Sequence, residues 1–234
     1  MIKRLMWIIS FIALAGTGIV LQFLPDSVPM HYDIAGNIDR WGSKNEKFIF
    51  PVLIIAISLF WTLFIRYYEK KASRSTDEKE ISGARSNAKV LSIVGLSMAV
   101  MFTAEHAFSL YGSYVEARDN ATNASVNTGK IPFILLGLML IIIGNFMTKT
   151  RINSAVGLRI SWSMYNDNTW RKSNFFAAIA IMITGVLMII ISVFIENALA
   201  LAAITVGLIT LASILSVIYA HKVYVQETKA QKKQ

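Results

Sequence analysis

The chain has 234 residues, of which 55% are apolar and 16% are charged, and its formal net charge is +9. In soluble domains roughly a quarter of the residues are charged, so this composition predicts a membrane protein and excludes an ordinary soluble domain. The sequence contains no cysteine, which excludes a disulfide framework and a cysteine-ligated metal site.

Six apolar windows are long enough to cross a hydrocarbon core of about 30 Å. The first follows two basic residues, as a signal peptide does, but its apolar run is too long and lacks a small-residue cleavage site, so we predict a retained helix. The fourth is the shortest and must stand nearly upright. In chain order the windows are residues 5–24, 48–65, 90–111, 131–147, 175–195 and 199–219.

The first two windows are joined by residues 25–47, which have a pattern of their own. Apolar and polar residues alternate over residues 28–34, and Ala-Gly-Asn follows at 35–37. This order predicts a small β-hairpin that caps the outer face. Pro29 has no N–H, so its strand must be an edge strand or begin at Met30.

A polar segment of mixed charge, residues 70–88, follows the second window. We predict a solvated cytoplasmic linker here. It divides the chain into an N-terminal two-helix unit (1–69), a four-helix membrane region (89–221) and a basic cytoplasmic tail (222–234).

Lysine and arginine are distributed unevenly between the connecting segments. The two termini and the inner connections hold 18 of the 23, and the alternate connections hold five. Cytoplasmic segments carry such an excess, which also explains the positive charge without direct nucleic-acid binding. The sequence therefore predicts an all-α integral membrane protein with six transmembrane helices, both termini inside, and a small extracytoplasmic hairpin-like loop.

The longest inner connection, residues 151–174, is semi-apolar. Apolar and polar side chains alternate from Val156 to Met164, which predicts an extended, strand-like piece on the membrane surface. Most connections are far shorter, so we expect this stretch to carry specificity.

Four residues of this stretch, Asn153, Gly157, Arg159 and Trp170, have the spacing N-x3-G-x-R-x10-W. This spacing resembles the signature of the SdpI family, bacterial membrane proteins that protect against secreted peptide toxins. Residues 24–44, LPDSVPMHYDIAGNIDRWGSK, resemble the L-P-x2-[IV]-P-x-H-[FY]-[DN]-x2-G pattern of the small N-terminal domain of unknown function that is commonly joined to that family.

The resemblance implies a membrane immunity protein of the bacterial plasma membrane that acts against a secreted antimicrobial peptide. It also implies that some members hold a small transcriptional repressor at the membrane once toxin is bound. Toxin would meet the outer face and a repressor the cytoplasmic face, with membrane lipid around both. The candidate partner-binding residues are His31, Tyr32, Asp33, Gly36, Glu105 and His106 outside, and Asn153, Gly157, Arg159, Trp162, Trp170 and Asn174 inside.

Two of these positions have competing interpretations. Glu105 lies roughly 24 Å along its helix from Lys89, so it is either an interfacial side chain that reaches headgroup water or a proton-relay or toxin-contact residue. Arg159 can hold a phosphate, a helix C-terminus or Asp167 with a forked hydrogen bond, or it can anchor the loop together with Trp162.

Metal binding and catalysis have little support. Glu105 and His106 point about 100° apart on a helix, no HExxH-type spacing occurs, and His31 and Asp33 are expected to satisfy backbone groups in the hairpin turn. Without a Gly-rich phosphate loop, a Gly-x-Ser-x-Gly elbow or a cysteine nucleophile, we predict no enzyme activity, metal or cofactor. The alternative function is a transporter of a small solute or lipid, or a membrane-enzyme subunit.

Overall fold

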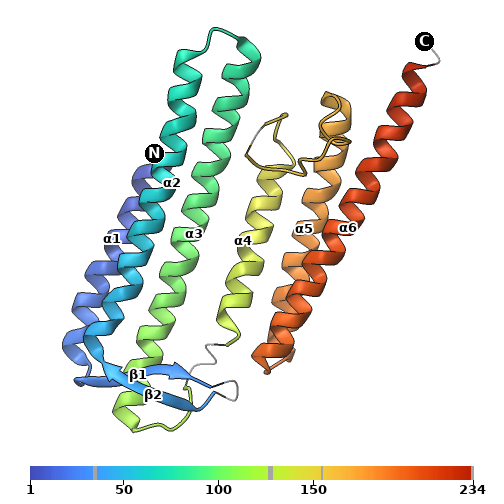
Figure 1. The fold of residues 1–234 in the computed structure, drawn as a ribbon. Coiled ribbons are helices and arrows are strands. Elements are labelled where there is room, and N and C mark those ends of the chain that lie inside the picture. Colours follow the sequence, from blue (N-terminus) through green and yellow to red (C-terminus); the bar gives the residue numbers. More distant parts are fainter. Residues whose placement is uncertain (34–35, 126–128, 154, 233–234) are drawn as a thin grey trace.

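The computed structural model describes residues 1–33, 36–125, 129–153 and 155–232. In these ranges six α-helices run along a common direction, and a two-stranded sheet lies across one end of the bundle (Figure 1). The helices are α1 (Ile2–Val20), α2 (Ile49–Arg74), α3 (Glu78–Asp119), α4 (Ile131–Met147), α5 (Asp167–Phe194) and α6 (Ala198–Gln231). The strands are β1 (Ser27–Tyr32) and β2 (Ile38–Ser43), and the short 3-10 helices η1 (Leu21–Phe23) and η2 (Lys44–Phe48) connect the sheet to the helices.

Five of these helices, all except α4, are long and apolar enough to cross a membrane. Only 22% to 39% of the most apolar window in each is buried, so most of this apolar surface faces outward, where lipid can cover it. The chain is therefore an α-helical membrane protein with a small antiparallel sheet, as predicted. Helix α4 has 17 residues, or roughly 26 Å at the usual rise, close to the lower limit for a span.

The helices form two groups. Helices α1, α2 and α3 pack against one another, α5 packs against both α4 and α6, and α3 and α4 join the groups. Glycines permit the close approach of α4 and α5: a Cβ on Gly137 would lie 2.7 Å from the carbonyl oxygen of Gly185, and one on Gly144 would lie 2.9 Å from that of Ala178. Small residues bring membrane helices together in this way.

Residues 70–88, expected to be a linker, are mostly helical. Helix α2 continues to Arg74 and α3 begins at Glu78, so only residues 75–77 lie between them. Hydrogen bonds to the Glu80 carboxylate explain the tight turn, since it accepts from Ser75 Oγ at 2.6 Å and pairs with Lys71 Nζ at 3.0 Å. The mixed charges therefore stabilise a helical hairpin that extends α2 and α3.

The predicted hairpin is confirmed, and we call the end of the bundle at which it lies the outer end and the opposite end the inner end. Strands β1 and β2 pair antiparallel, with Pro29 opposite Trp41 and the register shifting after Pro29. Because the sheet has two strands, both are edge strands, and proline is tolerated there. The second outer loop joins this sheet through Ile38 N to Thr122 O and Ala124 N to Gly36 O, both at 2.9 Å. Two residues of the predicted alternation and turn, 34 and 35, lie outside the described ranges.

Candidate functional site

The family-like signature on the inner side begins with an asparagine that shapes the loop. Asn153 is buried, and its Oδ1 accepts hydrogen bonds from the backbone N–H groups of Ala155 at 2.9 Å and Val156 at 2.8 Å. Its Nδ2 donates to the carbonyl of Arg151 at 2.8 Å. Asparagine makes such local backbone contacts in turns, so its role here is structural.

Gly157, Trp170 and Asn174 fasten the same loop to helix α5. Gly157 has φ of +124°, and a Cβ there would collide with Asn174 Oδ1. That oxygen accepts from Leu158 N at 2.7 Å, and Asn174 Nδ2 donates to the carbonyl of Trp170 at 3.1 Å. The Trp170 ring is buried and its Nε1 donates to Thr150 O at 3.0 Å. Gly157 and Trp170 of the signature, together with Asn174, therefore hold the loop on α5.

The strand-like interpretation of this loop is wrong. The described residues between α4 and α5 make bends and a turn, and no strand is found among them. Two of the alternating residues, Val156 and Leu158, pack on the buried Met147, Ala177 and Ala178 cluster of the second helix group. Ala155, just before them, packs on the Ile65, Ala88 and Leu91 cluster of the first group. Ser163 Oγ then hydrogen-bonds the backbone of Ile160 and the carbonyl of Leu158, which closes a turn. In a strand these backbone groups would instead pair with a neighbouring strand.

Arg159 differs from the rest of the signature. Its side chain is exposed, and its guanidinium makes no hydrogen bond or ion pair with any residue of the described ranges, Asp167 included. An intramolecular forked contact, one of the alternatives for this residue, is thus not formed with any residue that the structure describes. Arg159 is the signature residue whose hydrogen-bonding groups remain available to a partner.

Trp162 and the start of α5 lie against the inner end of α6. The Trp162 ring is 4.5 Å from the His221 ring, centroid to centroid. Asn166 and Asn168 donate to the two carboxylate oxygens of Glu227, at 3.0 Å and 2.5 Å. Since these contacts join the loop to the last helix, Arg159 projects from a fixed surface.

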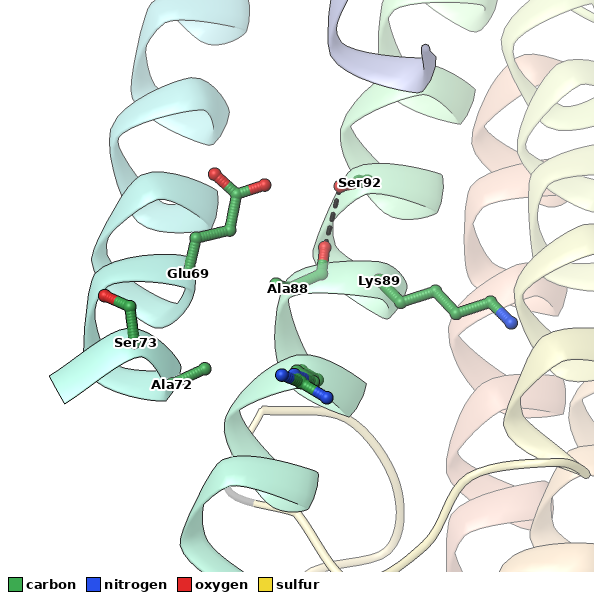
Figure 2. Close-up of a pocket in the computed structure, with 7 residues that line it drawn as sticks. Glu69, Ala72, Ser73, Ala88, Lys89 and Ser92 are labelled. Atoms are coloured by element: carbon green, nitrogen blue, oxygen red, sulfur yellow. Dashed lines mark hydrogen bonds between the residues drawn. The ribbon is translucent and has the colours of Figure 1, made fainter. Parts of the chain in front are cut away.

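A cavity of about 390 Å³ lies between the inner ends of α2 and α3, where the sequence had suggested only a linker. Figure 2 shows the Glu69 carboxylate of α2 directed toward the space between α2 and α3, while the Lys89 side chain extends away from α2. The Glu69 carboxylate already pairs with Lys3 of α1 at 2.6 Å. The Glu69 carboxylate is thus already engaged, while Arg85 and Lys89 of the lining make no hydrogen bond or ion pair with a described residue.

On the outer side, a buried carboxylate holds the sheet to the bundle. Glu116 of α3 is fully buried; its Oε2 accepts from the Tyr32 hydroxyl at 2.6 Å, and its Oε1 accepts from Ser125 N at 2.7 Å. Burial, and then the bond to Glu116, raises the pKa of Tyr32 above its usual range, so this phenol stays a donor at physiological pH. Tyr32 therefore has a structural role: it positions the two-stranded sheet of β1 and β2, which we call the outer cap.

Tyr32→Phe tests this attachment. The variant leaves Glu116 Oε2 buried without its donor, and we expect the cap to lose about 1.5–3 kcal/mol of stability against local opening. Hydrogen exchange of the β1 and β2 amides measures this loss. Tyr111→Phe is the control, because Tyr111 is 60% exposed; equal exchange in both variants would contradict the assigned role.

The other outer candidates are divided between the hairpin and the bundle. Asp33 accepts from Asn37 N at 2.8 Å, as predicted for the turn, while His31 Nδ1 instead contacts the carboxylate of Asp39 at 2.6 Å. Gly36 follows with φ of +86°, which glycine favours. Among the described residues no group of three or more His, Asp or Glu side chains is arranged to hold a metal ion.

His106 and Glu105 lie beneath the cap and face different partners. His106 is buried, contacts Thr17 Oγ1 through Nε2 at 2.8 Å and stacks on Phe50 at 5.3 Å. Glu105 is half-buried and makes no hydrogen bond or ion pair with any residue in the described part of the chain. The two side chains therefore share no partner, and they are not part of a metal-binding group among the described residues.

The comparisons with known proteins agree with both sequence resemblances. The model of the SdpI/YfhL protein family matches residues 149–220, which contain the inner loop signature. The model of a domain of unknown function, DUF1648, matches residues 8–55, which contain the hairpin. The chain is also similar to "Immunity protein SdpI" of Bacillus subtilis (strain 168), with 23% identity over 209 residues that cover 89% of each chain. No solved structure gives a significant match. Together with the apolar helices, these matches make the chain a multi-pass protein of the cell membrane.

Proposed function

From the SdpI/YfhL family region and the DUF1648 domain that this chain carries, we propose that it protects the cell against a secreted antimicrobial peptide. The observation that carries the proposal is the similarity to an immunity protein over 89% of both chains, which includes both ends of the bundle. The fixed outer cap is the face that a secreted peptide meets first. Immunity would then result from contacts between the peptide and this cap or the helices below it.

Complementation tests this function directly. We expect cells that lack the gene to be killed by the secreted peptides of the same or neighbouring strains, and to survive when the full chain is restored. Colony counts across a dilution series of producer-strain supernatant give the measurement. Equal killing with and without the chain, at confirmed membrane expression, would rule the function out.

We also propose a second contact on the cytoplasmic side, where a small repressor protein could be held. Arg159 supports this proposal, because the loop around it is fixed to α5 and α6 while its own guanidinium is exposed. Toxin binding outside and repressor binding inside would be coupled through the helices between them. A repressor that is retained by the membrane only in toxin-treated cells would support the coupling, and one that is never retained would exclude it.

The arrangement in the membrane that we propose has six spans with both termini inside. It rests on the asymmetry of lysine and arginine and on α4, whose 17 residues would cross nearly upright. Six crossings would place the cap and the α5–α6 turn on the same side of the membrane. In Figure 1 both lie at the same end of the bundle, which is consistent with this arrangement.

Single cysteines test this arrangement cleanly, because the chain has none of its own. We expect Thr122→Cys and Glu196→Cys to react with a membrane-impermeant maleimide in intact cells, and Ser161→Cys to react only after lysis. All three side chains are exposed, so access depends on the side of the membrane. If Thr122→Cys and Ser161→Cys label alike, α4 does not cross.

A further inference from the structure

An aromatic cavity lies beneath the outer cap, at the seam between the two helix groups. Its volume is about 170 Å³, and an apolar cavity of about 150 Å³ is large enough for a benzene-sized ligand. It is therefore the size of one amino-acid side chain. The described residues that line it are Tyr32, Phe50, Glu105, His106, Phe108, Ser109 and Ile131.

Glu105 is the charged side chain among these described lining residues, and it stands apart from the other outer carboxylates. Glu116 accepts two hydrogen bonds, and Glu46 accepts from Ser43 N at 3.0 Å. Lys47 is buried near Glu116 and Glu46, and also near His106. Half-buried carboxylates are normally paired, yet Glu105 has no described partner.

We propose that this cavity binds a single basic side chain, the ammonium of lysine or the guanidinium of arginine, from the peptide against which the chain protects. The rings of Tyr32, Phe50 and Phe108 line the cavity, and aromatic rings attract cations, while Glu105 supplies the opposite charge. Amphipathic antimicrobial peptides are rich in lysine and arginine on their polar face. This inference rests on the proposed function and names the chemistry of its ligand.

A lipid amine shares this chemistry, but the lining favours a peptide. A phosphatidylethanolamine headgroup would bring its phosphate together with its amine, and no lysine or arginine is found among the described residues that line the cavity. The phosphate would then lie near an unpaired carboxylate, which is unfavourable. A lone basic side chain carries no such anion.

The test uses the full chain in nanodiscs of phosphatidylglycerol, which contains no amine. The chain is labelled with 4-fluorophenylalanine, and the Phe108 resonance, assigned with Phe108→Leu, is followed during titration with n-butylammonium or with n-butanol, its neutral counterpart of similar size. We expect n-butylammonium to bind about tenfold more tightly than n-butanol. Glu105→Gln should abolish this preference, and Glu196→Gln, at an exposed carboxylate of the outer turn, should retain it.

Three results would overturn the inference. They are equal affinity for the two probes, a preference that persists in Glu105→Gln, and loss of n-butylammonium binding when phosphatidylethanolamine is added, which would assign the cavity to lipid. Binding is scored on purified protein and immunity is scored in cells. A chain that protects cells but shows no charge preference overturns this inference alone. A chain with the preference that fails to protect overturns the proposed function, and with it the peptide as the source of the basic side chain.

Discussion

Replacing Gly157 with alanine is expected to lower the free energy of unfolding by roughly 2–5 kcal/mol, combining backbone strain with the loss of a buried hydrogen bond. The φ of +124° at this position is one that an L side chain rarely adopts. The added methyl group would also displace Asn174 Oδ1 from the N–H of Leu158. Thermal melting of the detergent-solubilised chain measures the effect.

Gly207→Ala is the matched control for this variant. Gly207 lies within α6, and a Cβ there meets no other atom within 4 Å, so we expect no loss and a small gain from the helix propensity of alanine. Asn174→Ala should be destabilising as well. Because both losses involve the same contact, the double variant Gly157→Ala/Asn174→Ala should be less destabilised than the sum of the two. Full additivity would show that the clash with Asn174 is not the cause.

The outer cap could be predicted from the sequence because its signals are local. Alternating side chains, a glycine-containing turn and Pro29 all lie within residues 25–47, and together they specify two edge strands. The attachment of this cap to the bundle could not be predicted in the same way. Tyr32 and Glu116 are 84 residues apart, and no local pattern pairs them.

The inner loop shows why the same kind of pattern failed elsewhere. A period of two shows which residues share a side, and a strand also needs a neighbour for its backbone N–H and C=O groups. Val156 and Leu158 do share a side, packed on the cluster that contains Met147, while Ala155 packs on the cluster that contains Leu91. The loop conformation is determined by asparagine and serine side chains that bind its backbone, which periodicity does not detect.

The family-like signature located the important residues of this loop but did not distinguish their roles. Asn153, Gly157 and Trp170 each have a structural explanation in hydrogen bonds, a positive φ or burial. Arg159 has none among the described contacts, which separates it from residues that only maintain the loop. Spacing alone could not make this distinction, because it depends on which side chains the fold uses.

Arg159→Lys separates recognition by Arg159 from anchoring. Lysine keeps the positive charge but lacks the planar fork that binds a carboxylate or phosphate with two hydrogen bonds. We expect the variant to accumulate in the membrane and to melt as the unmodified chain does, since the guanidinium supports no described contact. Losing a charge-assisted bond costs roughly 1.5–3 kcal/mol, or about 10- to 150-fold in affinity for the partner.

The measurement compares survival under toxin, and retention of any cytoplasmic partner, at equal membrane levels of each variant. Arg151→Lys is the control, because Arg151 is also exposed and lies in the same loop, so the same exchange there should leave function unchanged. Full activity of Arg159→Lys would contradict the forked-contact hypothesis. Arg159 would then be an interfacial anchor that requires only a positive charge. If the Arg159→Lys protein did not accumulate in the membrane, Arg159 would instead have a role in folding. That result would be unexpected, because Arg159 makes no hydrogen bond or ion pair with a described residue.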